Sequence, residues 1–373
     1  MNNFSVPADF TAETIDQYDI LNHTYIDKVS ETYGQLNEPG NPYGSGRASD
    51  HMPYCDHTTL KKYIDYAKGM NIGFNYVLNT TCLSNEEFSV AGIKKFINFL
   101  KHLIDIGVES VTVCLPSLIE LIIESGLPLK IKGSTVCCIT NAERAKTYKT
   151  MGVHRIVVDE SINRDFESLK RINTIFPGEL EMIVNVICNK NCIYRSFHHN
   201  QMSHDFNYGQ KSISYYSYRC MLKRVEEPEN LLKMCFVRPE DLCLYEKIPI
   251  NRYKIQGRQA VLNGNIPKTV EAYMKKSFDG NLLDLLDCFS PTNSFRFHLE
   301  NRLLNTFLDP FCQTGFCNNN CDDCNYCENY MKSHFDIDAV KSINKMALRF
   351  YKTTDNYKRT IKEVMEGNDD GKN

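Results

Sequence analysis

The sequence predicts an α/β fold, a (β/α)8 TIM-like barrel with a long insertion after the seventh strand and a C-terminal extension. Short runs rich in Val, Ile, Phe and Tyr alternate with amphipathic segments over residues 1–280, the order expected of a parallel barrel. Phrases such as IDIGVESVTV and YKTMGVHRIVV are typical of a helix that closes on Gly before the next strand. A doubly wound open sheet is the alternative, since one miscounted strand would change the topology.

Eight apolar runs are predicted as strands because they are rich in β-branched and aromatic residues and are bounded by Gly, Pro or Asp. They cover residues 4–8, 28–33, 72–78, 110–114, 130–135, 155–158, 180–187 and 253–256. Between them, apolar residues recur at three- and four-residue spacing, which predicts helices. These helices cover residues 57–70, 92–106, 117–125, 141–151 and 164–176.

The pattern divides the chain into a barrel over residues 1–280 and an extension over residues 281–373. The span 188–245 is too long for an ordinary strand-to-helix loop, and its His, Cys and aromatic content predicts a functional insertion. A helix follows the eighth strand at about 267–278. The extension contains a Cys-rich metal segment, 312–330, and a charged terminal helix, 337–366.

Composition excludes several classes of protein. The net charge of −3 argues against a protein whose main role is to grip a phosphate backbone. The first thirty residues carry acids and lack a basic start followed by an apolar run, so no signal peptide is expected, and no apolar stretch is long enough to span a membrane. We therefore expect a cytoplasmic protein whose sixteen cysteines serve as reduced metal ligands more readily than as disulfides.

The strongest signal is the C-terminal segment FCNNNCDDCNYCENY. It places Cys317, Cys321, Cys324 and Cys327 at C-x3-C-x2-C-x2-C spacing, separated by Asn and Asp. Four thiols this close can surround one metal centre. Compact runs of this kind favour a 4Fe-4S cluster, whereas structural zinc more often uses two separated pairs, so zinc stays open as the alternative. Cys312 is a spare thiol that could replace one ligand.

A second, looser group lies in the insertion. Cys188 follows the seventh strand, at the mouth of the predicted barrel where active sites are built, and Cys192 and Cys220 follow it. These three are predicted to bind a second 4Fe-4S cluster, with nearby Arg and Lys to balance its charge. The fourth ligand is open between Cys235 and Cys243, and a buried core thiol is the alternative for each.

Polar side chains near the predicted mouth are catalytic candidates. His198 and His199 could line a substrate pocket or move protons, or they could be ordinary loop histidines. Arg195 could bind a carboxylate or phosphate, or be surface charge. Lys254 and Arg258 flank the end of the eighth strand, where an inward Lys could contact an anion or form a salt bridge within the barrel.

The block YKIQGR at residues 253–258, with RPEDLCLYEKIPI before it and QAVLNGNIPKTVEAYMKK after it, resembles the signature of the collagenase-like peptidases, family thirty-two of unknown catalytic type. The resemblance extends over most of residues 1–280. It implies a barrel with a cluster-binding cysteine set, and an anaerobic hydroxylation role known for several members. The chain departs from the family pattern at Gln256, at the C-x3-C pair of Cys188 and Cys192, and in its C-terminal cysteines.

Two iron–sulfur clusters in one chain are expected where electrons are transferred. The chain is therefore predicted to be an iron–sulfur oxidoreductase or hydroxylase-type modifying enzyme. An external electron donor and a small-molecule, peptide or RNA substrate are the expected partners, with a related protein as a possible hetero-oligomer partner. A peptidase, as the family name implies, is the alternative. A non-catalytic iron–sulfur partner in an RNA or metabolite modification complex is a third possibility.

Overall fold

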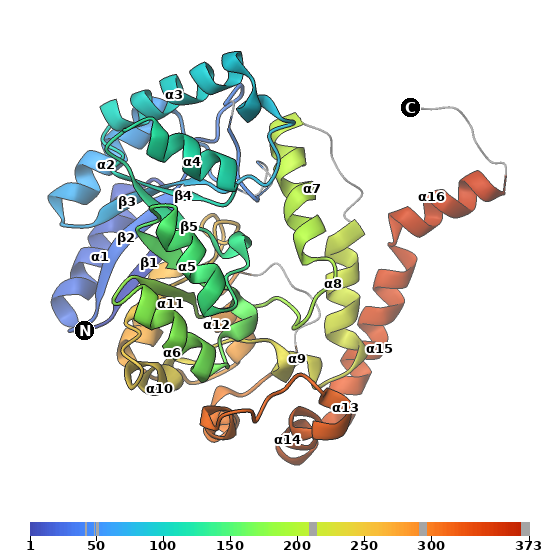
Figure 1. The fold of residues 1–373 in the computed structure, drawn as a ribbon. Helices are drawn as coiled ribbons and strands as arrows, with labels where there is room; N and C mark the ends of the chain where they lie inside the picture. Colours follow the sequence, from blue (N-terminus) through green and yellow to red (C-terminus); the bar gives the residue numbers. More distant parts are fainter. Residues whose placement is uncertain (42, 48, 50–51, 209–214, 291–296, 367–373) are drawn as a thin grey trace.

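Eight parallel strands close into a barrel, as predicted. The computed structural model describes residues 1–41, 43–47, 49, 52–208, 215–290 and 297–366. Each strand pairs with its neighbours in chain order, and the last pairs with the first (Figure 1). The strands are β1 (Asn3–Pro7), β2 (Lys28–Gly34), β3 (Gly73–Leu78), β4 (Ser110–Val113), β5 (Lys130–Gly133), β6 (Arg155–Val157), β7 (Leu180–Ile183) and β8 (Arg252–Lys254).

The register closes the barrel through β1 and β8, where Asn3 lies opposite Arg252 and Phe4 opposite Tyr253. Strands of this kind are covered on both faces, so their residues are buried almost without interruption, as in β3. The outer faces pack against a ring of helices, and the apolar side chains form one continuous core. The carboxyl ends of all eight strands therefore meet at one rim.

The helices around the barrel begin at side-chain caps that the sequence supplies. The Asp56 carboxylate accepts the backbone N–H of Thr59 at 2.7 Å, and Ser89 and Asn141 cap their helices in the same way. These helices are α1 (Ala12–Thr24), α2 (His57–Gly69), α3 (Val90–Asp105), α4 (Pro116–Glu124), α5 (Ala142–Thr150), α6 (Phe166–Ile175) and α11 (Ile266–Lys275). Helix α1 was not predicted, because its few buried residues give only a weak apolar pattern.

Several predicted strands end earlier than expected, and the runs 130–135 and 180–187 are two examples. The run 130–135 leaves the sheet after Gly133, and Thr135–Cys137 forms the short 3-10 helix η3. The run 180–187 leaves it after Ile183, although the Val184 N–H still reaches the Lys254 carbonyl at 3.1 Å. Both truncations lie at the carboxyl rim, where the chain turns away from the barrel axis to build the mouth.

The insertion after β7 folds into helices that cover one side of the mouth (Figure 1). Its first two helices are the longest and stand beside the barrel opening. The insertion contains α7 (Arg195–Tyr208), α8 (Tyr215–Glu226), α9 (Asn230–Lys233), η5 (Pro239–Asp241) and α10 (Leu242–Glu246).

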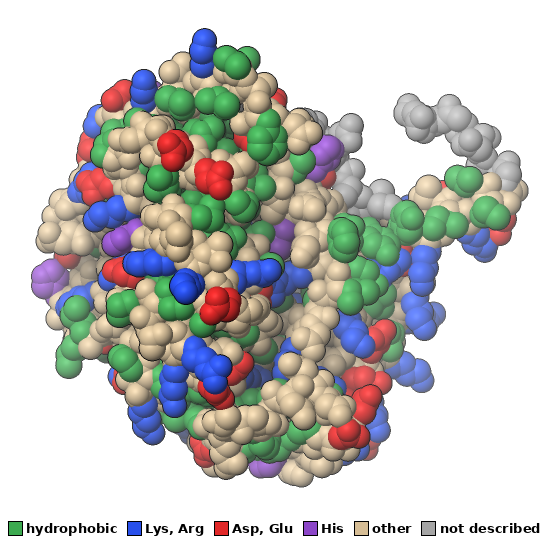
Figure 2. Space-filling model, viewed as in Figure 1, with side chains coloured by type: hydrophobic (Ala, Val, Ile, Leu, Met, Phe, Trp, Pro, Cys, Tyr) green, Lys and Arg blue, Asp and Glu red, His purple; other side chains and the backbone are tan. Residues whose placement is uncertain are grey.

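The C-terminal extension packs on the same core as the barrel through side chains such as Phe307, Phe311 and Met331. It contains α12 (Leu282–Leu286), η6 (Asn301–Leu304), η7 (Asp309–Cys312), α13 (Cys321–Cys324), α14 (Tyr326–His334), α15 (Ile337–Thr353) and α16 (Asn356–Met365). The predicted terminal helix is therefore two helices. Asp355 breaks it by capping α16 and by accepting the Arg219 guanidinium at 2.6 Å. Helix α15 lies along α8, and α16 projects from the body with hydrophobic side chains on its surface (Figures 1 and 2).

Candidate active site at the barrel mouth

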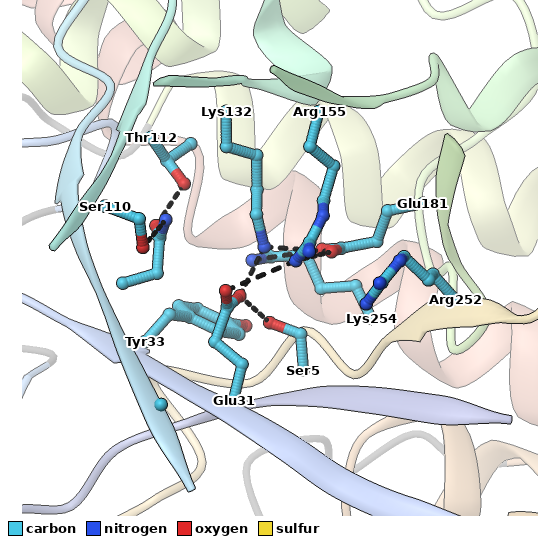
Figure 3. A network of polar contacts seen from close by, with 12 residues as sticks. Ser5, Glu31, Tyr33, Ser110, Thr112, Lys132, Arg155, Glu181, Arg252 and Lys254 are labelled. Carbon is cyan, nitrogen blue, oxygen red and sulfur yellow. Dashed lines mark hydrogen bonds and ion pairs between the residues drawn. The ribbon is translucent and has the colours of Figure 1, made fainter. Parts of the chain in front are cut away.

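A charged network fills the lower part of the barrel interior, toward the amino ends of the strands (Figure 3). The Lys132 ammonium donates to Glu181 at 2.8 Å and also contacts Glu31. The Arg155 guanidinium lies 3.3 Å from Glu31 and 3.7 Å from Glu181. Burial alone would raise the pKa of Glu181, but the charges of its cationic neighbours lower that pKa to about 2. The network is thus ionised and internally compensated.

Lys254 ends β8 and lies directly above this network, where its ammonium caps the Tyr33 ring at 3.4 Å from the centroid. The nearest carboxylate oxygen, on Glu181, is 3.8 Å away, and the ammonium has no hydrogen-bond partner among the described residues. Burial and the charge of Lys132 lower the pKa of Lys254 to about 7. Glu181 is shared with two closer cations, so its attraction does not offset these effects. Lys254 therefore titrates near neutral pH.

Above Lys254 opens a cavity of about 180 Å³, lined by strand ends and by the insertion. Arg258 lies in its wall and is buried, donating to Gln35 at 2.9 Å and to Ser45 at 2.7 Å. Both acceptors are neutral, and burial together with the charge of Arg47 lowers the pKa of Arg258 to about 10. Since Arg47 and Arg224 also line the cavity, its walls favour an anion.

Arg195 was predicted to bind an anionic substrate, and the structure gives it a protein partner. Its guanidinium forms a bidentate pair with Asp159, one arm of which measures 3.0 Å, and lies 3.7 Å from Glu160. Burial would raise the pKa of Asp159, but its bonds with Arg195 and Ser161 lower it. Arg195 thus ties the start of α7 to the end of β6 and positions the cavity wall.

His198 and His199 follow on α7, with ring centroids 6.5 Å apart, and both line the cavity. Burial and the charge of Arg47 lower the pKa of His198 to about 4 and that of His199 to about 3. Both rings are therefore neutral at pH 7, which suits hydrogen bonding better than proton donation. Of the candidate proton carriers in the cavity, Lys254 is better matched to neutral pH.

The insertion brings two of the predicted cysteines, Cys188 and Cys220, into the lining of this cavity. The Cys220 thiol lies 3.5 Å from the Asn189 amide and 3.9 Å from the Arg224 guanidinium. Burial raises the pKa of Cys188, and the nearby charges of Glu160 and Cys220 raise it further. Burial likewise raises the pKa of Cys192, on which the charge of Cys220 also acts. Cys220 is therefore the thiol that the other two share.

The two candidates for a fourth ligand lie elsewhere. Burial raises the pKa of Cys235, Arg164 and Lys190 lower it, and the charge of Cys317 raises it, so Cys235 lies beside the C-terminal cysteines. Cys243 is exposed on α10, with its sulfur 3.4 Å from the Glu240 carbonyl. Among the described residues, no three His, Cys, Asp or Glu side chains are close enough to enclose a single metal ion.

The C-terminal cysteines line a cavity of their own, of about 90 Å³, on the outside of the barrel. Lys190, between Cys188 and Cys192 in the chain, donates to the Cys317 sulfur at 2.9 Å. Cys312 is exposed on η7 and does not line this cavity. Lys190 is therefore a neighbour of both cysteine groups. It lies within the Cys188–Cys192 segment of the chain, and its side chain contacts Cys317 of the C-terminal group.

Five of the mouth side chains could be named from the sequence, but the network below them was not expected. Lys132 and Glu181 interrupt otherwise apolar strands, as in KIKG and LEMI, and that interruption was the available signal. A charge inside a buried strand requires a buried counter-charge. Which strands supply it depends on the closure of the barrel, which a linear pattern does not give.

Comparison with known proteins agrees with this architecture. The model of peptidase family U32 matches residues 46–282. A curated protein of Methanocaldococcus jannaschii, described as an uncharacterized protease, is 32% identical over 287 residues, which cover 76% of this chain and 83% of that protein. A solved U32 peptidase structure superposes with a TM-score of 0.50 and 17% identity over 68% of this chain and 92% of that one, a likeness of fold. No helix within the described residues is long and apolar enough to cross a membrane. By the family match and this relative, the chain belongs to peptidase family U32.

Proposed function

We propose that this chain is an iron–sulfur enzyme of oxidoreductase type that modifies an anionic substrate bound in the barrel-mouth cavity. One observation carries the proposal: Cys188 and Cys220 line a cavity whose lining also includes Arg47, Arg224 and Arg258, and Cys192 lies near enough for the charge of Cys220 to act on it. Thiolates beside cations suit a cluster of net negative charge. Nothing in that arrangement favours attack on a peptide bond over electron transfer.

The donor set fits such a cluster in its chemistry. Next to Cys220, the side-chain oxygen of Asn189 and the Nε of Arg224 are buried without a hydrogen-bond partner among the described residues. Buried polar groups of this kind require a partner, and a negatively charged group held by the thiols would give Arg224 one. Cys188, Cys192 and Cys220 would hold the cluster, and the position of the fourth ligand stays open. When bound, it would supply one-electron transfer beside the cavity.

The remaining side chains have roles that follow from their charge. Arg258 and Arg47 would hold the negative group of the substrate, because the partners of Arg258 are neutral. Lys254 would take or give a proton at the floor of the cavity, since it titrates near pH 7. The neutral rings of His198 and His199 would orient the substrate by hydrogen bonds.

A direct test is purification without oxygen, followed by iron and sulfide analysis and visible spectroscopy. The Cys188→Ala/Cys220→Ala double variant should lose the part of the dithionite-bleachable cluster absorption that the barrel cysteines hold in the wild type. Cys243→Ala is the matched control, because Cys243 is exposed on α10, lines neither cysteine cavity and should change nothing. A wild-type protein that is active but free of iron would overturn the proposal.

The name of the family and of the curated relative favours a second candidate, a peptidase. Peptide hydrolysis that persists undiminished in the Cys188→Ala/Cys220→Ala variant would support this alternative. Loss of peptide hydrolysis together with the cluster would instead indicate that hydrolysis and the redox activity use the same barrel-mouth cavity.

A further inference from the structure

The C-terminal cysteine segment is held against the barrel by a cluster of aromatic side chains. The Phe316 ring packs edge-on against Phe311 and Tyr326, each at 5.2 Å between centroids. Arg164, from the barrel, lies over the Phe311 ring at 5.3 Å and over Phe307 at 5.0 Å. Phe316 and Tyr326 directly adjoin Cys317 and Cys327 in the chain, so the cysteine loop is built on a packed base.

The loop encloses space with sulfur on its walls. All four cysteines of the segment line the cavity of about 90 Å³, and the barrel side is formed by cations that include Lys190 and Arg164. Acidic side chains also line the rim, but Glu229 is paired with Lys233 at 3.3 Å and Glu328 with Lys332.

Lys190 is aimed at this cavity from the loop after β7. Its ammonium donates to the Cys317 sulfur at 2.9 Å, short for a hydrogen bond to sulfur. Thiols accept such bonds weakly, whereas thiolate or cluster-bound sulfur accepts them well. The contact therefore places a positive charge beside a sulfur that lines the cavity, where it would stabilise an anionic group held by the cysteines.

We propose that Cys317, Cys321, Cys324 and Cys327 ligate a second iron–sulfur cluster in this cavity, and that Lys190 tunes its reduction potential. A single zinc ion would draw four sulfurs to about 2.3 Å from one point. In this chain the four cysteines line one cavity of about 90 Å³, and their C-x3-C-x2-C-x2-C spacing favours a cluster over two separated zinc-binding pairs. The role of this cluster as a relay to the barrel mouth rests on the proposed function, but its presence does not.

The relay needs only one electron. Cys317, Cys321, Cys324 and Cys327 would hold the outer cluster, which when bound would supply a one-electron carrier, and an external one-electron donor protein is the partner that it implies. Lys190 lies within the Cys188–Cys192 segment of the chain and contacts the outer cysteine group. Its positive charge favours the reduced, more negative state of the outer cluster.

The first test is iron and sulfide content after anaerobic purification, with folding checked by circular dichroism. The Cys321→Ala/Cys324→Ala variant should lose about half of the wild-type iron if the chain holds two four-iron clusters. Cys312→Ala, in the same extension, should lose none. Zinc in place of iron, or full retention of iron in the Cys321→Ala/Cys324→Ala variant, would overturn the proposal.

The same measurement separates this inference from the proposed function. If only the outer cluster exists, the Cys188→Ala/Cys220→Ala variant keeps all its iron and the Cys321→Ala/Cys324→Ala variant loses all of it. If only the barrel cluster exists, the pattern is reversed.

The second test addresses Lys190 in the Cys188→Ala/Cys220→Ala background, where the outer cluster alone contributes. A redox titration followed by electron paramagnetic resonance should give a more negative midpoint potential for Lys190→Met, at unchanged iron content. Lys190→Arg should restore the wild-type potential. A midpoint potential that is the same in all three proteins would overturn the role of Lys190.

Discussion

Buried charges are paired with opposite charges at the amino end of the barrel interior, whereas a buried cation at the carboxyl end has neutral partners. At the amino end, Lys132 and Arg155 are matched by Glu31 and Glu181, and the carboxylates stay ionised because the cations surround them. At the carboxyl end, the partners of Arg258 among the described residues are neutral: the oxygens of Gln35 and Ser45 and, at 4.0 Å, the sulfur of Met52. Both ends are buried, so position in the fold alone does not explain the difference.

The contrast teaches how to separate structural charge from functional charge in this fold. A network of paired buried charges fixes the relative positions of the strands that carry them, and it costs desolvation energy. Removing one of its side chains leaves the other charges without a partner. An uncompensated cation in a cavity costs stability and is retained where an anion must bind. Lys254 stands at the boundary, 3.8 Å from Glu181 and open to the cavity.

The largest expected effect is at the compensated end. Glu181→Gln should lower the free energy of unfolding by about 3–5 kcal/mol, because it strips Lys132, Arg155 and Lys254 of a shared counter-charge. Urea denaturation measures the loss. Glu109→Gln is the matched control, since Glu109 is an exposed partner of Lys68 and should change stability by less than about 0.5 kcal/mol. Equal effects at the two sites would remove the distinction between the ends.

Lys254→Met tests the side chain that lies between the paired network and the cavity. Its effect on the free energy of unfolding should depend on pH. The folded pKa of Lys254, about 7, lies below its ordinary value of 10.5, so the cost of burying its charge is complete below pH 7. That cost is relieved as pH rises from 7 toward 10.5, because the unfolded chain then binds more protons than the folded one. The variant should therefore be more stable than wild type at pH 6, by about 2–4 kcal/mol, with the gain shrinking by pH 10.

Denaturant titrations at several pH values measure this difference. A stability difference that is constant from pH 6 to pH 10 would mean that Lys254 keeps its charge throughout. It would then belong with the compensated network, as an ordinary ion-pair partner of Glu181.

The sequence was sufficient for the barrel because strand runs and helix patterns are local. All eight strands were placed within a few residues, and the misjudged ends, such as 180–187, lie at the rim where the chain leaves the sheet. Cysteine spacing likewise singled out the C-terminal segment. What it could not give was the pairing of residues across the barrel. Lys132 and Glu181 are 49 residues apart, and only closure of the sheet brings them to 2.8 Å.

The site shows the same limit. Lys254 and Arg258 were named from their place after the eighth strand, and both line the cavity. Arg195 looked equally available in sequence, but Asp159, 36 residues earlier, occupies its guanidinium. Cys235 was one of two candidates for the fourth ligand beside Cys188, but it does not line the mouth cavity, and the charge of Cys317 acts on it in the fold. Residue type and spacing identify candidates, and tertiary pairing decides which remain available.

A smaller effect is expected at the uncompensated end. Inorganic phosphate should raise the melting temperature of the wild type by occupying the cationic cavity, and Arg258→Met should weaken this binding at least about tenfold, or about 1.4 kcal/mol. Lys68→Met, on the outer surface, should leave the phosphate effect intact. Thermal unfolding across a phosphate series measures both. An undiminished phosphate shift in Arg258→Met would place the anion elsewhere.

The smallest expected effect is that of a change of pH at the two histidines, His198 and His199, whose protonation state should not change. Burial and the neighbouring Arg47 hold the pKa of His198 at about 4 and that of His199 at about 3, so neither ring should gain a proton between pH 8 and pH 5.5. The NMR chemical shifts of their carbon-bound ring protons, assigned with His198→Gln and His199→Gln, should stay constant over this range. Free imidazole in the same sample should titrate and serves as the control. A ring that titrates near pH 6.5 would show that the mouth tolerates one more cation. The excess positive charge that sets the carboxyl end apart would then be neutralised by a group still to be identified.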